Sequence, residues 1–419
     1  MSAMVTLSGG LPLHMIERQG PAILAARLVL AGGSGADRPT GRGGAQLLAG
    51  VMTRGCGDLG PEDLADLVEG AGAALRADAS EDSLILSLKC AREDAATLLP
   101  LLIRMVRAPQ LLDDQVALER QLNLQTLQRQ REDPFQLAYD GLRHLLYGHG
   151  PYGHDPLGVA EDLVGLGRSD LLPLQAALGQ RGAVLVLCGD APAEAREQLD
   201  AELQAHGWTN GTAVAPGIRQ APPGATTLSC LEQDTEQLVL MLGAATVPLG
   251  HDDAQALRLL QAHLGQGMSC RLFQEMREQR GLAYDVGVHL PARRGPAPFV
   301  VHLSTSAERA AEATSCLLAE WRRLAEVPLT PAERDLALAK LRGQDAMGRQ
   351  TCGQIAERQA LLLSHGLPAD HLDHCLARAA ELGSDELQAV AQRWLSQPCL
   401  SLVGPAEALH QAEGHHPGG

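Results

Sequence analysis

The chain has 419 residues, more than a single hydrophobic core usually holds, so we expect two domains. Hydrophobic residues make up 45% of the chain, which excludes a disordered protein. Acidic residues outnumber basic ones 50 to 34, and no apolar stretch approaches the ~20 residues of a membrane span, so nucleic acids and membranes are not expected partners.

The cysteines and the start of the chain indicate a compartment. Nine cysteines, an odd number, are scattered from Cys56 to Cys399 without a close pair, which favours free thiols in a reducing environment. The first ten residues have neither a basic segment nor an apolar segment of the kind that marks a protein for export. We therefore expect a cytoplasmic protein.

The predicted elements follow the same order in the two halves of the chain. Each half begins with a strand, continues with a helix, a second strand and long amphipathic helices, and ends with a short apolar strand. The first strands are predicted at 23–30 and 237–242, the long helices at 113–132 and 331–346, and the last strands at 184–189 and 399–404. Long helices that follow hairpin-like strands indicate α+β layers rather than a parallel βαβ array.

The spacing of the matching segments indicates an internal duplication. Ala95 and Ala310 follow strands of the same outline and are 215 residues apart, and the closing glycines Gly189 and Gly404 have the same offset. Glu119 and Glu333, in the long helices, are 214 residues apart. We therefore predict two homologous domains, each a mainly antiparallel sheet packed with helices.

The predicted domain boundaries come from turn-forming composition. Residues 1–208 would form the first domain, 227–410 the second, and the Gly- and Pro-rich residues 209–226 the linker between them. Residues 411–419, which include His415 and His416, are predicted to be a disordered tail.

Residues 41–56, Gly-Arg-Gly-Gly-Ala-Gln-Leu-Leu-Ala-Gly-Val-Met-Thr-Arg-Gly-Cys, resemble the signature helix of the inverzincin metallopeptidases, the family of insulinase, pitrilysin and mitochondrial processing peptidase. In that family a His-x-x-Glu-His run holds zinc and the catalytic base on one helix face. A carboxylate from a later helix completes the site. Residues 119–134 resemble that later helix, and residues 147–158 also resemble a family segment.

The resemblance places unsuitable residues at each zinc position. The two histidine positions hold Gln46 and Gly50, the position of the base holds Ala49, and the distal ligand position holds Thr126. Glu119 occupies the supporting acidic position. Ala and Gly have no ligand atom, and amide and hydroxyl groups are poor zinc ligands. We therefore expect no metal to be bound by this chain, and we interpret the pair His371 and His374, with its adjacent thiol, as an ordinary helix turn.

The second half keeps a different family motif in residues 264–286, which include Arg-Leu-Phe-Gln-Glu-Met-Arg-Glu-Gln-Arg-Gly-Leu-Ala-Tyr. The family's functional Arg and Tyr, seven residues apart, fall on Arg277 and Tyr284. Both side chains are hydrogen-bond donors that could hold a substrate carbonyl and stabilise an oxyanion. The alternative is that Arg277 pairs with Glu275 or Glu278 and that Tyr284 packs in the core.

The resemblance implies a function for a chain that lacks the zinc ligands but keeps the Arg/Tyr pair. Bacterial two-subunit enzymes of the family divide the zinc site and the Arg/Tyr pair between two chains. This chain resembles the non-catalytic, substrate-binding subunit, which supplies Arg277 and Tyr284 to a composite site of a zinc metalloendopeptidase that acts on unfolded peptides. Zinc is then expected in a catalytic inverzincin partner, in a heterodimer. The alternative is a structural or peptide-binding pseudopeptidase without a role in proteolysis.

Overall fold

The computed structural model describes residues 2–192, 194–208, 211 and 226–414. The chain forms two compact units that interleave along the sequence. The first unit comprises Met1–Gln128, Asp155–Gly217 and Met347–Ala369, and the second comprises Arg129–His154, Ile218–Ala346 and Asp370–Gly419. None of the described helices is both long and apolar enough to cross a membrane.

The first unit is built on a six-stranded sheet in the order β1-β2-β6-β3-β5-β4. β2 and β6 are parallel and the other neighbouring strands are antiparallel. The strands are β1 (Ser2–Thr6), β2 (Pro12–Glu17), β3 (Ile23–Ala31), β4 (Ala74–Ala79), β5 (Ser83–Ala91) and β6 (Val184–Gly189).

Strand β5 shows how the sequence determines the two faces of this sheet. Leu84, Leu86 and Leu88 are buried in the main core of the unit, while the residues between them point to the opposite face. The main core is covered by α1 (Gly44–Met52), α2 (Pro61–Gly70), α3 (Ala95–Arg107), α4 (Asp113–Gln130), α6 (Ala160–Leu163), α7 (Arg168–Ala177) and α8 (Ala195–His206).

The second unit has a five-stranded sheet in the order β7-β11-β8-β10-β9. Its strands are β7 (Leu228–Glu232), β8 (Gln237–Ala245), β9 (Asp285–His289), β10 (Pro298–Ser306) and β11 (Cys399–Gly404). Its main helices are α9 (Ala254–Gly265), α10 (Ala310–Glu326), α11 (Pro331–Met347), α13 (His371–Glu381), α14 (Ser384–Trp394) and α15 (Ala406–Glu413).

The strand registers confirm the predicted fold class and its internal duplication. Leu13 pairs with Leu185 in a parallel ladder of the first sheet, and Leu228 pairs with Leu400 in a parallel ladder of the second. Both partners are thus displaced by 215 residues, the offset predicted from the sequence. The order β7-β11-β8-β10-β9 repeats the order β2-β6-β3-β5-β4, so β1 is the additional strand of the first sheet.

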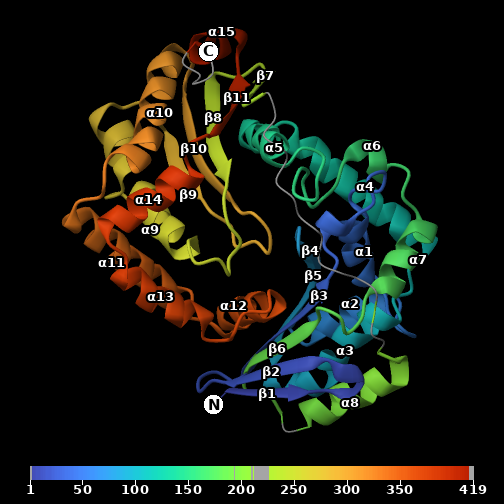
Figure 1. Ribbon diagram of the computed structural model, residues 1–419. Helices are drawn as coiled ribbons and strands as arrows, with labels where there is room; N and C mark the ends of the chain where they lie inside the picture. Colours follow the sequence, from blue (N-terminus) through green and yellow to red (C-terminus); the bar gives the residue numbers. More distant parts are fainter. Residues whose placement is uncertain (1, 193, 209–210, 212–225, 415–419) are drawn as a thin grey trace. The chain divides into compact units, whose positions relative to one another are not determined.

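Each unit receives one helix from the other half of the chain. Helix α5 (Pro134–Tyr147) packs on β8 and β11 of the second unit, and helix α12 (Cys352–Ser364) packs on β3 and β6 of the first, as Figure 1 shows. Small and branched apolar residues form the second contact, among them Ala25, Val29, Val186, Ala356 and Ala360. The compact units therefore differ from a division of the chain at the predicted linker.

Several predicted element boundaries differ from those in the structure. The predicted strands and long helices are present, but β1, β2 and β7 were not expected. Most of the predicted linker and residues 415–419 lie outside the described residues. Residues 411–413, assigned from the sequence to the tail, are the last turn of α15, because Leu409 and Ala412 continue its buried face. No disulfide joins the nine cysteines, all of which lie in the described ranges.

Candidate functional site

Helix α1 carries three of the four positions that would form a zinc site in the resembled family. Asp37 caps the start of this helix by accepting hydrogen bonds from the backbone N–H groups of Gly43 and Ala45, at 2.8 and 2.9 Å. Burial raises the pKa of the Asp37 carboxyl to about 6, although these hydrogen bonds act in the other direction. The helix is therefore fixed at its first turn.

Gln46 is engaged with the neighbouring sheet. Its Oε1 atom accepts a hydrogen bond of 2.7 Å from the backbone N–H of Ala79, at the end of the edge strand β4. Ala49 is completely buried in the core. The first histidine position thus satisfies a backbone donor, and the position of the base contributes only packing.

Gly50 and Glu119 are in direct contact. A Cβ atom at position 50 would overlap Glu119 Oε1, so the carboxylate occupies the space that a side chain at 50 would need. Arg54 donates two hydrogen bonds, of 2.8 and 2.6 Å, to Glu119 Oε2. The supporting acidic residue of the resembled site is therefore paired with a guanidinium.

Thr126 lies on the same helix as Glu119, and its hydroxyl donates to the backbone carbonyl of Leu122, at 3.0 Å. These contacts show that the four positions do not fit a zinc ion, since two lack ligand atoms and the polar groups of Gln46 and Thr126 are engaged elsewhere. Throughout the described part of the chain, no three His, Cys, Asp or Glu side chains are grouped as a metal site.

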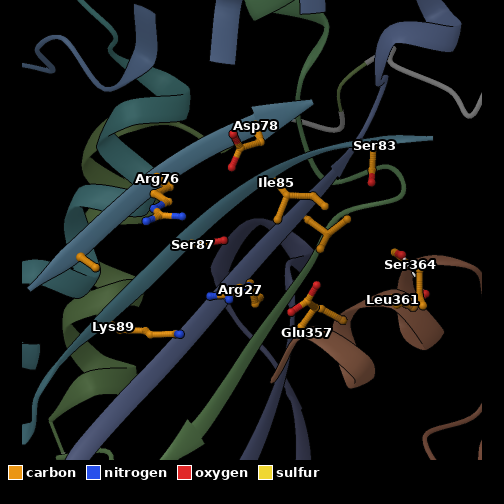
Figure 2. Close-up of a pocket in the computed structure, with 13 residues that line it drawn as sticks. Arg27, Arg76, Asp78, Ser83, Ile85, Ser87, Lys89, Glu357, Leu361 and Ser364 are labelled. Atoms are coloured by element: carbon orange, nitrogen blue, oxygen red, sulfur yellow. Dashed lines mark hydrogen bonds between the residues drawn. The ribbon is translucent and has the colours of Figure 1, made fainter. Parts of the chain in front are cut away.

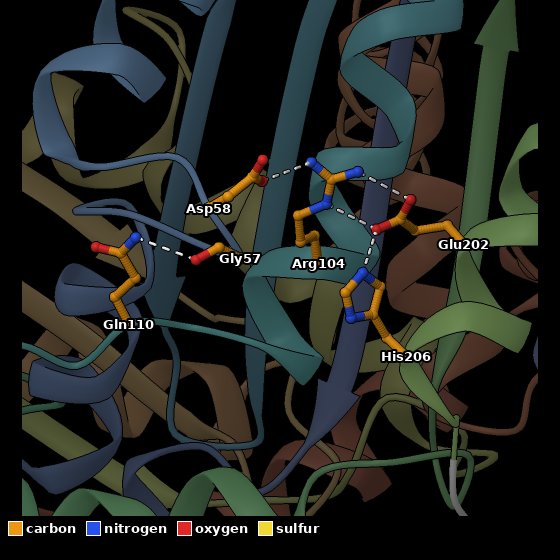
Figure 3. Close-up of polar contacts among 6 residues, drawn as sticks. All are labelled: Gly57, Asp58, Arg104, Gln110, Glu202 and His206. Atoms are coloured by element: carbon orange, nitrogen blue, oxygen red, sulfur yellow. Dashed lines mark hydrogen bonds and ion pairs between the residues drawn. The ribbon is translucent and has the colours of Figure 1, made fainter.

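Polar contacts hold the turn that follows α1 (Figure 3). Arg104 of α3 donates to both carboxylate oxygens of Glu202 on α8, at 2.8 and 3.1 Å, and these bonds raise the pKa of the guanidinium. His206 adds a 2.9 Å contact to Glu202, while Gln110 donates to the carbonyl of Gly57 in the turn. Hydrogen bonds and ion pairs thus join α3 to α8 and fix the turn that follows α1.

Arg277 and Tyr284 lie beside each other in the second unit, on either side of a tight turn. The guanidinium of Arg277 donates to the backbone carbonyl of Tyr284 at 3.2 Å and lies 5.1 Å from the ring centroid of Phe273. The Tyr284 side chain is 80% exposed. The exposure of Tyr284 argues against a tyrosine packed in the core. Of the two glutamates considered as partners of Arg277, Glu275 and Glu278, the first pairs with Arg271 instead.

The segment that carries Arg277 is π-helical, η4 (Phe273–Gln279), a form that often occurs at functional sites. It is anchored by Arg271, which donates to both carboxylate oxygens of Glu320 on α10, at 2.8 and 2.9 Å. These bonds raise the pKa of Arg271. The backbone N–H of Leu282 donates to Met276 at 2.6 Å and closes the turn before Tyr284.

Comparisons with known proteins agree with these observations. Residues 16–156 match the profile described as "Insulinase (Peptidase family M16)", and residues 176–341 match the "Peptidase M16 inactive domain". The chain belongs to the insulinase family of peptidases. The resemblance predicted from the sequence is thereby confirmed.

Relatives in the insulinase family cover nearly the whole chain. An "uncharacterized zinc protease" of Streptomyces coelicolor is 24% identical over 97% of this chain and 91% of its own length. One of Mycobacterium tuberculosis is 25% identical over 96% of this chain and 92% of its own. Among solved structures, a "peptidase M16 inactive domain" from Pseudomonas fluorescens has a TM-score of 0.87 at 24% identity, covering 97% of this chain and 98% of that one.

Three residues of the site region were not singled out from the sequence. Arg54 neutralises Glu119, and Arg271 and Glu320 together anchor η4. Arg271 lies within the motif at 264–286, so its position could have marked it. The partner Glu320 has no such signal, because it is 49 residues away and reaches η4 only through the fold.

Proposed function

We propose that this chain is the non-catalytic, substrate-binding subunit of a heterodimeric zinc metalloendopeptidase. The observation that carries this proposal is the contrast between the two motifs. The zinc positions Gln46, Ala49 and Gly50 are committed to structure, whereas Arg277 and Tyr284 are exposed side by side. Zinc and the base would come from a catalytic inverzincin chain of similar fold.

Arg277 and Tyr284 would act on the substrate carbonyl. A guanidinium and a phenol that donate to the carbonyl oxygen stabilise the negative charge that develops there when water attacks the peptide bond. In this role the two residues lower the barrier of a reaction whose nucleophile belongs to the partner chain. The guanidinium of Arg277 is held by its hydrogen bond to the backbone carbonyl of Tyr284.

Edge strand β4 offers a second way to hold the substrate. It lies at the end of its sheet, and the backbone groups on its outer side can pair with an extended peptide. The contact between Gln46 and Ala79 marks one end of that edge. Such pairing reads the backbone and suits unfolded peptides of varied sequence.

The test is an assay of peptide cleavage by this chain alone, by the partner alone and by their mixture. We expect cleavage by the mixture only, with zinc measured in the partner and not in this chain. Zinc-dependent cleavage by this chain alone would reject the proposal. Capture of assembly subunits and of no His-x-x-Glu-His chain would favour the structural or peptide-binding pseudopeptidase.

Substitution of the pair gives the first specific prediction. Arg277→Ala or Tyr284→Phe should lower the turnover of the mixed complex about 10²-fold, as the loss of an oxyanion donor does. Arg280→Ala, at another exposed arginine three residues further on, is the matched control and should leave turnover unchanged. Equal turnover for all three variants would remove Arg277 and Tyr284 from the mechanism.

A further inference from the structure

A cavity of about 400 Å³ lies in the first unit between the sheet and the exchanged helix α12. It is on the sheet face opposite the main core. Figure 2 shows Arg27, Ser87, Lys89 and Arg76 on the strands and Glu357 on α12. The zinc-site positions and the Arg277–Tyr284 pair take no part in it.

The strand register places two arginines on either side of one serine. Ser87 of β5 pairs with Arg27 of β3 on one side and with Arg76 of β4 on the other. Neighbouring strands are about 4.8 Å apart, so the two guanidinium groups flank the serine hydroxyl in a single row. Lys89 follows two residues later on the same face of β5.

These cations are not neutralised by ion pairs. Within the described parts of the chain, no carboxylate oxygen lies within 4.0 Å of the charged groups of Arg27, Arg76 or Lys89, although Asp78 and Glu357 line the same cavity. Arg27 donates to the carbonyl of its neighbour Ala26, at 3.2 Å. Three cations and two carboxylates thus line the cavity of a chain whose net charge is −16.

The electrostatics of the cavity favour an anion. Burial lowers the pKa of Arg27, Glu357 and Asp78 raise it, and the nearby cation Arg76 lowers it further. The net pKa is lowered, so the charged guanidinium would gain from an additional negative partner. Lys89 lies against the first turn of α12, where a Cβ atom at Gly353 would be 3.0 Å from its Nζ. The helix N-terminus carries a partial positive charge, which adds to that of the lysine.

We infer that this cavity binds a carboxylate group of the peptide substrate, from either an acidic side chain or a free C-terminus. Arginine and carboxylate groups match in geometry, since a guanidinium can donate two parallel hydrogen bonds to one carboxylate. The apolar walls formed by Ile85 and Leu361, and the continuation of the cavity to the edge strand β4, suit a peptide better than a small inorganic anion. The inference names the substrate class of the proposed peptide-binding function and rests on it.

The test is equilibrium binding of labelled unfolded peptides to this chain alone, followed by fluorescence anisotropy. Two peptides differ at one central position, Glu or Gln, and both have amidated C-termini. We expect the Glu peptide to bind about tenfold more tightly than the Gln peptide, as a charge-assisted bond contributes. A third peptide has Gln at the centre and a free C-terminus. Its affinity shows whether a terminal carboxylate can replace the carboxylate of the Glu side chain.

Variants of exposed residues give opposite effects. Arg76→Gln and Lys89→Gln should each reduce the preference for the carboxylate peptides to less than about threefold, whereas Glu357→Gln should increase it. Arg196→Gln, an exposed arginine on α8, is the matched control and should leave the preference unchanged. Because all four side chains are on the surface, circular dichroism can establish that each variant folds.

Three outcomes would overturn the inference. These are equal affinity for the carboxylate and amide peptides, a preference that survives both cation substitutions, and tighter binding of inorganic phosphate than of any peptide. The assay does not involve the partner chain. If the mixture of the two chains fails to cleave peptides but this chain prefers carboxylate peptides, the proposed function is contradicted and this inference stands. If the mixture cleaves peptides but this chain shows no such preference, only this inference is contradicted.

Discussion

Gly50 shows how one of the four positions assigned to the zinc site is packed in this chain. The carboxylate of Glu119 fills the space beside it and is held there by Arg54. A histidine placed at 50 would therefore have to displace an ion pair before it could reach a metal. The packing of α1 against α4 thus leaves no room for a side chain at position 50.

A pair of glycine substitutions tests this packing. Gly50→Ala should lower the free energy of unfolding by about 1–2 kcal/mol, because the new methyl group pushes Glu119 from Arg54. Gly70→Ala, at a helical glycine with no atom within 4 Å of the added Cβ, should raise it by up to about 1 kcal/mol. Urea unfolding of both variants measures the difference, and two changes of the same sign would contradict the packing argument.

At this scale the resemblance assigns residues to the zinc positions, but the sequence does not show what these residues contact in the fold. Gln46 accepts from the backbone of Ala79, 33 residues away, and only the folded sheet brings the two together. The sequence likewise does not decide whether Tyr284 is buried or exposed, because a tyrosine next to apolar residues occurs both in cores and on surfaces.

At the scale of the elements, the π-helical segment η4 depends on its attachment to α10. The bidentate contact between Arg271 and Glu320 has side-chain exposures of only 26% and 10%, so it is largely shielded from water. Such a contact fixes orientation as well as position. It therefore fixes the backbone immediately before the segment that carries Arg277.

Removing the charge of Glu320 tests this attachment. Glu320→Gln should lower the turnover of the mixed complex about tenfold, with little change in KM, because Arg277 is positioned less well for the transition state. Hydrogen exchange should become faster in η4. Glu312→Gln, an exposed residue of the same helix, is the control, and equal turnover in the two variants would show that Glu320 serves stability alone.

Elements with a strong pattern were predictable, and those that depend on neighbours were not. The apolar runs of β6 and β11 and the long helices α4 and α11 lie where the sequence placed them. The π-helical form of η4 could not be predicted, since its apolar spacing is also compatible with an α-helix.

At the scale of the whole molecule, three histidines whose pKa values are lowered make stability depend on pH. Partial desolvation lowers the pKa of the half-buried His263 and His302, and of the more exposed His289, below the usual value of 6.5; all three lie in the second unit. Above that value both the folded and the unfolded states are neutral at these positions. Below it the unfolded chain binds protons that the folded chain does not, so acid favours unfolding.

We therefore expect the urea midpoint of the second unit to be lower at pH 5.5 than at pH 7.5. His263→Gln should make this dependence weaker, because one of the three groups is removed. His410→Gln, at an exposed histidine of α15, should leave the dependence as it is. Midpoints that rise on acidification would contradict the sign of this argument.

The duplication of the fold could be predicted from the constant offset between segments, but the exchange of α5 and α12 could not. An amphipathic helix shows that one of its faces is buried without showing which sheet buries it. Ala356 and Ala360 fit equally well with either sheet when only the sequence is considered.

The exchange of these helices has a consequence for the history of the chain. In an ancestor of half this length, the equivalent helix would not have packed on the sheet of its own chain. That sheet would have been covered by the same helix of a second copy, in a domain-swapped dimer. Joining two such copies end to end turns a swapped homodimer into one polypeptide. The interleaved architecture is what an ancient pair of identical subunits would leave behind after fusion.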